Sequence, residues 1–200
     1  LTLGGGVTFN GDQGNQGPAT ISGNLALGGA TRTFTVNGTT NSTLTVSANI
    51  TGASGNGLVK SGAGVLSLGG SNSFDGTVAV NQGTVALDNA NAIAGGGNIT
   101  FGGGTLRYSS NNTLDVSGRI TGSSGAISID TAGQNATWAT SLDSSNTNGL
   151  AKLGAGTLTL TTANNYNGAT AINGGTLAIS AANQLSSGSL SIGNGTLLSL

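Results

Sequence analysis

Two long segments of this chain match each other without a gap. Residues 57–94 align with residues 149–186, at an offset of 92 residues. Both copies open on G-L-x-K-x-G-A-G-x-L-x-L, pass through an aromatic residue followed two positions later by glycine, and close on G-T-h-A-h, where h is apolar. Repetition on this scale is typical of architectures in which each unit packs on its neighbours. The chain is therefore expected to be an array of similar units.

A shorter period lies inside each copy. The glycines that open the G-T-h signature and its relatives recur at spacings of 19 to 21 residues. One circuit of a parallel β-helix, here called a rung, has about this length. The 200 residues are therefore expected to form roughly ten rungs of 19–21 residues.

A larger unit also recurs. The opening residues Leu1-Thr2-Leu3-Gly4-Gly5-Gly6 have counterparts that start at Ile99 and at Leu190. We therefore expect residues 1–200 to be one continuous slice of a longer β-helical array. Its super-repeats would cover 1–98 and 99–189, and a third would start at 190–200.

Apolar residues alternate with Thr, Ser and Ala inside the rungs, and Gly, Asn, Asp and Ser gather between these segments. A period of two predicts strands with one buried face, joined by tight corners. Thr170 is an exception, because the first copy has Val78 at that position. The pairs expected to point inward are Phe34 and Val36, Leu44 and Val46, Leu66 and Leu68, Val78 and Val80, Leu114 and Val116, Ile127 and Ile129, and Leu158 and Leu160.

The residues that the two copies share, together with the aromatic residue of each copy, are expected to have a structural role in the repeat. In the first copy they are Gly57, Leu58, Lys60, Gly62, Gly64, Leu66, Leu68, Phe74, Gly76, Gly83 and Thr84, and in the second Gly149, Leu150, Lys152, Gly154, Gly156, Leu158, Leu160, Tyr166, Gly168, Gly175 and Thr176. This pattern resembles the passenger-associated repeat of bacterial autotransporters. The resemblance implies an all-β, right-handed parallel β-helix, also called a β-solenoid.

The same resemblance implies a function. Such repeats belong to secreted passengers on the bacterial cell surface, where this chain would be a structural and adhesive segment whose repeats aid secretion by sequential folding. Its partners would be other cell surfaces, matrix polysaccharide or copies of itself. Anchoring in the outer membrane would depend on a part outside these residues, such as a C-terminal translocator barrel.

Composition excludes several functions. Three Arg, two Lys and six Asp give a net charge of −1, so no basic face for nucleic acid is expected. His, Cys, Met and Glu are absent, which removes the usual general base, the thiol nucleophile and any zinc site. We expect no catalytic residue, no cofactor and no metal. No apolar run approaches the roughly 18 residues of a membrane helix.

Three alternatives compete with the secreted stalk. A transmembrane β-barrel shares the alternating pattern, but seven aromatic residues in 200 are too few for its two girdles. Thr-x-Thr on a flat face, as in 33–35, 43–45 and 157–159, suggests an ice- or carbohydrate-binding module. A polysaccharide-degrading β-helix enzyme would need paired carboxylates; the candidates are Asp75, Asp88, Asp115 and Asp130.

Four further features have plain structural interpretations. Lys60 and Lys152 are expected at corners, with apolar stems on the core and solvated ammonium heads. Trp138 is expected to pack inward; if exposed, it would be a candidate sugar platform. The polar stretch 10–17 has one carboxylate, so we expect a loop there in preference to a calcium site.

Overall fold

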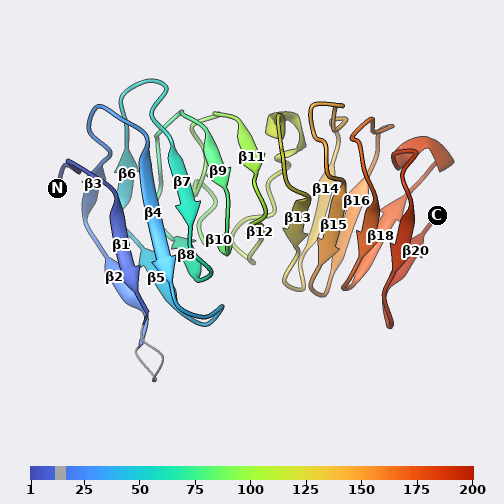
Figure 1. Ribbon diagram of the computed structural model, residues 1–200, viewed down its shortest axis with the longest axis horizontal. Coiled ribbons are helices and arrows are strands. Elements are labelled where there is room, and N and C mark those ends of the chain that lie inside the picture. The colour runs from blue at the N-terminus through green and yellow to red at the C-terminus, as the bar shows by residue number, and fades with distance from the viewer. Residues whose placement is uncertain (12–16) are drawn as a thin grey trace.

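The protein is a parallel β-solenoid in which short strands stack along one axis (Figure 1). The computed structural model describes residues 1–11 and 17–200. Every pairing between named strands in this part of the chain is parallel. The expected all-β solenoid is confirmed.

The described strands form four sheets. The five-stranded sheet contains β1 (Val7–Asn10), β4 (Arg32–Asn37), β7 (Leu58–Ser61), β9 (Val78–Val80) and β11 (Ile99–Phe101). The nine-stranded sheet contains β2 (Ala19–Ile21), β5 (Thr43–Val46), β8 (Val65–Leu68), β10 (Thr84–Leu87), β12 (Thr105–Arg107), β13 (Ile127–Asp130), β15 (Leu150–Leu153), β17 (Thr170–Ile172) and β19 (Leu190–Ile192). The four-stranded sheet contains β14 (Asn135–Trp138), β16 (Thr157–Leu160), β18 (Thr176–Ile179) and β20 (Leu197–Ser199), and the two-stranded sheet β3 (Asn24–Ala26) and β6 (Asn49–Thr51). Two 3₁₀ helices, η1 (Ser117–Arg119) and η2 (Ala182–Gln184), interrupt the described strands.

The nine-stranded sheet takes one strand from each rung, so the chain completes about eight rungs between β2 and β19. The expected number of ten was slightly too high. Paired residues are 19 apart between β8 and β10, as the repeat period predicts, but 25 apart between β2 and β5. The rungs outside the repeats are longer because their corners contain more residues.

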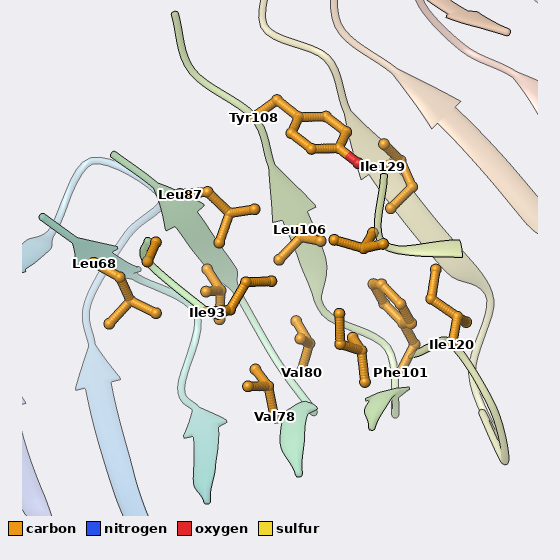
Figure 2. Close-up of a cluster of buried hydrophobic side chains, with 14 of the residues drawn as sticks. Leu68, Val78, Val80, Leu87, Ile93, Phe101, Leu106, Tyr108, Ile120 and Ile129 are labelled. Carbon is orange, nitrogen blue, oxygen red and sulfur yellow. The ribbon is translucent and has the colours of Figure 1, made fainter. Parts of the chain in front are cut away.

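The interior is a stack of aliphatic side chains in register from rung to rung. On the nine-stranded sheet, Leu44 pairs with Leu66, and the column continues through Val85, Leu106 and Ile129. All five side chains are buried. Figure 2 shows residues from different sheets, such as Val80, Leu87 and Phe101, directed into the same interior. Alternate inward residues therefore form a continuous apolar core, as the sequence pattern predicts.

One expected inward pair is wrong. Val116 is buried, but Leu114 is 45% exposed and does not lie in a strand. The Leu114 backbone N–H donates to the Asn112 side chain at 3.0 Å, and its carbonyl accepts from the Tyr108 hydroxyl at 2.8 Å. These two side chains capture backbone groups that a strand ladder would use, so the segment leading into η1 is irregular.

The two repeats enter the solenoid on different sheets. In the first repeat, β7 and β8 belong to the five-stranded and nine-stranded sheets. The corresponding strands of the second repeat, β15 and β16, belong to the nine-stranded and four-stranded sheets. The second repeat therefore begins one sheet further round the solenoid than the first.

The shift develops between the repeats. Register passes from Leu58 to Val78, then to Ile99 and Ile120, after which β13 joins the nine-stranded sheet. The next strand, β14, starts the four-stranded sheet. Trp138, the largest fully buried side chain of the described residues, and the buried Tyr108 fill the interior here, with the indole N–H donating to the Tyr108 hydroxyl at 2.9 Å.

Candidate functional site

Both repeat lysines lie inside the core. Lys60 is in register between Phe34 and Val80, and Lys152 between Ile129 and Ile172, so each occupies a place in a column of apolar residues. Their exposed fractions are 0%. The expectation that their heads are solvated was therefore wrong. Lys60 and Lys152 have the same strand parity as Leu58 and Leu150, which puts their stems on the buried face.

Each buried ammonium group is bound by three backbone carbonyls. The Lys60 Nζ donates to the carbonyl oxygens of Ser61 at 2.8 Å, Gly62 at 2.7 Å and Gln82 at 3.2 Å. The Lys152 Nζ repeats this with Leu153 at 2.8 Å, Gly154 at 2.8 Å and Gly174 at 3.0 Å.

All three ammonium donors are thus satisfied, as a buried charge requires. We call each ammonium and its three carbonyls a lysine clip. Two carbonyls of a clip come from its own rung and the third from the next rung.

The glycines of the motif make the clips possible. Gly62 and Gly154 follow the lysines by two residues and have φ of +75° and +65°. A side chain is strained in this left-handed region, which turns the chain sharply after the strand. Gly83 and Gly175 begin the next rung, and a Cβ on either would lie 2.3 Å from a carbonyl oxygen of the rung below. Close approach at the clip therefore requires glycine on both rungs.

Burial makes the lysines weaker bases. Loss of solvent lowers the pKa of Lys60 from 10.5 to about 8. The pKa of Lys152 is also lowered to about 8 by burial, and the nearby Asp130 carboxylate opposes this shift. The three carbonyls of each clip therefore offset only part of the cost of removing the ammonium group from water.

Two arginines bind the backbone in the same way. Arg32 donates from Nε to the Leu27 carbonyl and from Nη2 to the Leu3 carbonyl, both at 2.6 Å. Arg119 of η1 donates to the carbonyls of Gly97 and Ile93, again at 2.6 Å. Burial lowers the pKa of Arg119. These cations join rungs and are not gathered into a binding face.

The candidate catalytic aspartates bind backbone and hydroxyl groups of their own rung or of the adjacent rung. Asp75 accepts from the Gly55 N–H at 2.7 Å, Asp88 from the Ser67 hydroxyl at 2.6 Å and Asp130 from the Ala132 N–H at 2.8 Å. Asp115 binds Ser117 and the Ala139 N–H. Each has the environment of a corner residue. Within residues 1–11 and 17–200, no group of three or more His, Cys, Asp or Glu could hold a metal.

The Thr-x-Thr pairs do not form one face. Residues 33–35 lie in β4, 43–45 in β5 and 157–159 in β16, which belong to three different sheets. On the adjacent rung, Thr43 and Thr45 face Val65 and Ser67, so the pattern stops after one strand. An ice-binding surface needs a ladder over many rungs, and these residues do not supply one.

Trp138 packs inward as predicted, with 1% of its surface exposed. Most of the stretch 10–17 lies outside the described residues, so the calcium question is untested. Among the described residues, no helix is long and apolar enough to cross a membrane.

The second repeat has a polar pair inside its core. The hydroxyls of Tyr166 and Thr170 are 2.6 Å apart and both residues are buried. The first repeat has Phe74 and Val78 at these positions. The unexpected Thr170 is therefore explained by its partner, because each hydroxyl satisfies the other.

The parallel strands, stacked apolar columns and clips define this chain as a repeat protein of the β-solenoid class. The passenger-associated-transport-repeat family matches residues 58–87 and 150–179, so the chain carries two copies of that repeat. Each matched segment starts at the strand that contains the clipped lysine and ends with the strand of the following rung. This family is a passenger repeat and not an enzyme family. No curated protein and no solved structure matches the chain.

Proposed function

We propose that this chain is a structural and adhesive segment of a secreted autotransporter passenger, held at the bacterial cell surface as a rigid stalk. The proposal rests on the agreement between the residues that match the family and the residues that form the clips. Both matched segments contain a lysine, the corner of the next rung that completes its clip, and the strand that follows this corner. The repeat that the family describes therefore contains one complete clip, which supports a structural role.

The clips support a role in ordered assembly. Fixing the backbone of a 20-residue rung costs roughly 20 to 40 kcal/mol, and a lone rung cannot recover this from its own side chains. A clip is complete only when the carbonyl of Gln82 or Gly174 arrives from the following rung. Stacking on a folded neighbour therefore supplies both strand hydrogen bonds and the third ligand of a buried charge. Such stepwise folding outside the cell would favour continued export of the chain.

The location is tested by brief treatment of intact producing cells with a broad-specificity protease, followed by mass spectrometry of the released peptides. Peptides from residues 57–87 and 149–179 are expected in the supernatant while a periplasmic marker protein stays intact. If these peptides appear only after lysis, the surface location is wrong.

A second experiment tests the role of the clips in export. Cells that produce the full-length protein with Lys60→Met and Lys152→Met are expected to display less of it, because the third carbonyl then gains no ammonium partner. Arg107→Met is the control, because it removes a part-exposed cation from β12, outside both clips. Equal display of the lysine variants and the natural protein would contradict this role.

A further inference from the structure

A pocket of about 390 Å³ lies at the second repeat, between residues 164–167 and the next rung at residues 183–187. We propose that this pocket binds a neutral saccharide unit. Its volume is within the range of small-molecule sites, toward the lower end. The proposal rests on the proposed function in one respect, since a cell-surface segment is where extracellular polysaccharide would be met.

The lining is polar and uncharged. It consists of asparagine and serine side chains together with Tyr166 and the half-buried Leu185. Amides supply both hydrogen-bond donors and acceptors, which suits the hydroxyl groups of a sugar. No carboxylate, ammonium or guanidinium group lines the pocket. This chemistry favours a neutral polyol over a phosphate, a uronic acid or a metal ion, each of which would require a compensating charge.

Two of the four asparagines that line the pocket have engaged side chains: Asn164, and Asn167, whose amide donates to the Ser144 carbonyl at 2.9 Å. Asn164 is buried and fully engaged, since it accepts from the Leu142 N–H at 2.8 Å and donates to the carbonyls of Thr162 and Gln184 at 2.9 and 2.7 Å. It fixes the wall of the pocket across three rungs. The amide side chains of Asn165 and Asn183 are exposed and have no hydrogen-bond partner among the described residues, so these groups can bind a ligand.

The first repeat has different residues at the positions that correspond to the pocket. Asn165 corresponds to Ser73. Asn167, which binds the Ser144 carbonyl, corresponds to Asp75, whose carboxylate accepts from Gly55 and Ser54. Leu185 corresponds to Ile93, which is 1% exposed and therefore packed into the core. The same rung in the first repeat thus has a shorter side chain, a charge and a buried aliphatic residue. The free amides belong to the second repeat.

The test is a two-dimensional NMR titration of the 200-residue chain with D-glucose, D-galactose, N-acetyl-D-glucosamine, cellotetraose and chitotetraose. Saturable shifts of the Asn165 and Asn183 side-chain amides are expected with at least one of these sugars. D-glucuronate is expected to bind more weakly than D-glucose. Absence of saturable shifts with every neutral sugar, or tighter binding of glucuronate, would overturn the proposal.

Matched variants locate the binding. Asn183→Ala is expected to weaken the responding sugar about tenfold, equivalent to about 1.4 kcal/mol. Asn91→Ala, at the corresponding position of the first repeat, is expected to leave the affinity unchanged. Equal effects of the two variants would overturn the assignment to this pocket. Because the titration is done in solution, failure of the surface experiment would reject the location and leave the binding result standing.

Discussion

The two repeats have nearly the same sequence frame and occupy different places in the solenoid. The first repeat begins on the five-stranded sheet and the second on the nine-stranded sheet, yet both lysines bind three carbonyls in the same arrangement. The neighbours of the two lysines also differ, being Phe34 and Val80 in one case and Ile129 and Ile172 in the other.

The repeat motif determines its local structure, but it does not determine the sheet to which its strands belong. The strand, the glycine corner, the clip and the strand of the next rung are preserved together, so the motif encodes them. The sheet on which the motif lies depends on the length of the chain between the repeats. A repeat of this kind can therefore be inserted at different positions round a solenoid without loss of its own contacts.

The largest expected effect tests whether close approach at the clip is common to both repeats. Gly83→Ala and Gly175→Ala should each lower the free energy of unfolding by about 3–5 kcal/mol, since a left-handed φ and a carbonyl clash add. Gly122→Ala is the control, because Gly122 has a φ of +67° and open space around its Cβ position. It should cost only about 1–2 kcal/mol. Urea denaturation followed by circular dichroism measures all three, and equal costs would show that the clash carries no penalty.

Removal of the ammonium groups comes next in size. Lys60→Met and Lys152→Met should each destabilise the protein by about 2–3 kcal/mol, because three buried carbonyls lose a charged donor while the apolar column stays filled. If the clip is the same unit in both repeats, the two losses should agree to within about 0.5 kcal/mol. A large loss in one repeat alone would show that the surrounding sheet matters more than the motif.

The pH dependence of stability follows from the same groups. Each lysine titrates at 10.5 in the unfolded chain and at about 8 in the folded protein, so between these values the unfolded state binds more protons. The free energy of unfolding should therefore rise with pH in this window, by at most about 1.4 kcal/mol per pH unit and per lysine.

Measurement should stop near pH 9.5. Above about pH 10, burial of Tyr108 has the opposite effect, because its raised pKa keeps a proton that the unfolded chain loses. The double variant Lys60→Met, Lys152→Met should show a flat profile between about pH 8 and 9.5. A slope that persists in this variant would assign the effect to other groups.

The smallest expected effect on stability concerns the hydroxyl pair that distinguishes the core of the second repeat from that of the first. Tyr166→Phe or Thr170→Val alone should cost about 1 kcal/mol, because each leaves one buried hydroxyl without its partner. The double variant recreates the Phe and Val pair of the first repeat and should recover most of this loss. Thermal unfolding of the four proteins gives the coupling energy, and additive losses would mean that the hydroxyls do not interact.

Much of the fold could be predicted from the sequence because it is local. Alternation identified the inward residues, and the period of glycines identified the rungs. The same alternation places Lys60 on the inward face with Leu58, so its burial could have been inferred. The prediction of a solvated ammonium group at Lys60 instead followed the general tendency of lysine heads to stay in water. At Leu114 the alternation gave the wrong prediction, because the Leu114 N–H donates to the Asn112 side chain and its carbonyl accepts from the Tyr108 hydroxyl.

Other features depend on contacts between rungs. The third ligand of each clip is a backbone carbonyl, at Gln82 or Gly174, and a backbone group has no sequence signature. The change of sheet depends on the lengths of several irregular corners between β11 and β15. The pocket likewise arises where η2 leaves the regular stack beside Asn165 and Asn167. No single sequence motif determines these contacts between rungs.

The position of the only tryptophan gives the protein an intrinsic fluorescent probe at one chosen place. Trp138 is enclosed where the four-stranded sheet begins and donates its indole N–H to Tyr108. Its emission therefore reports on the junction between the repeats, whereas a backbone signal averages over all rungs. If emission and ellipticity change together during unfolding, the solenoid melts as one body. If the emission shifts later, the ends unravel first and the junction is the last part to open.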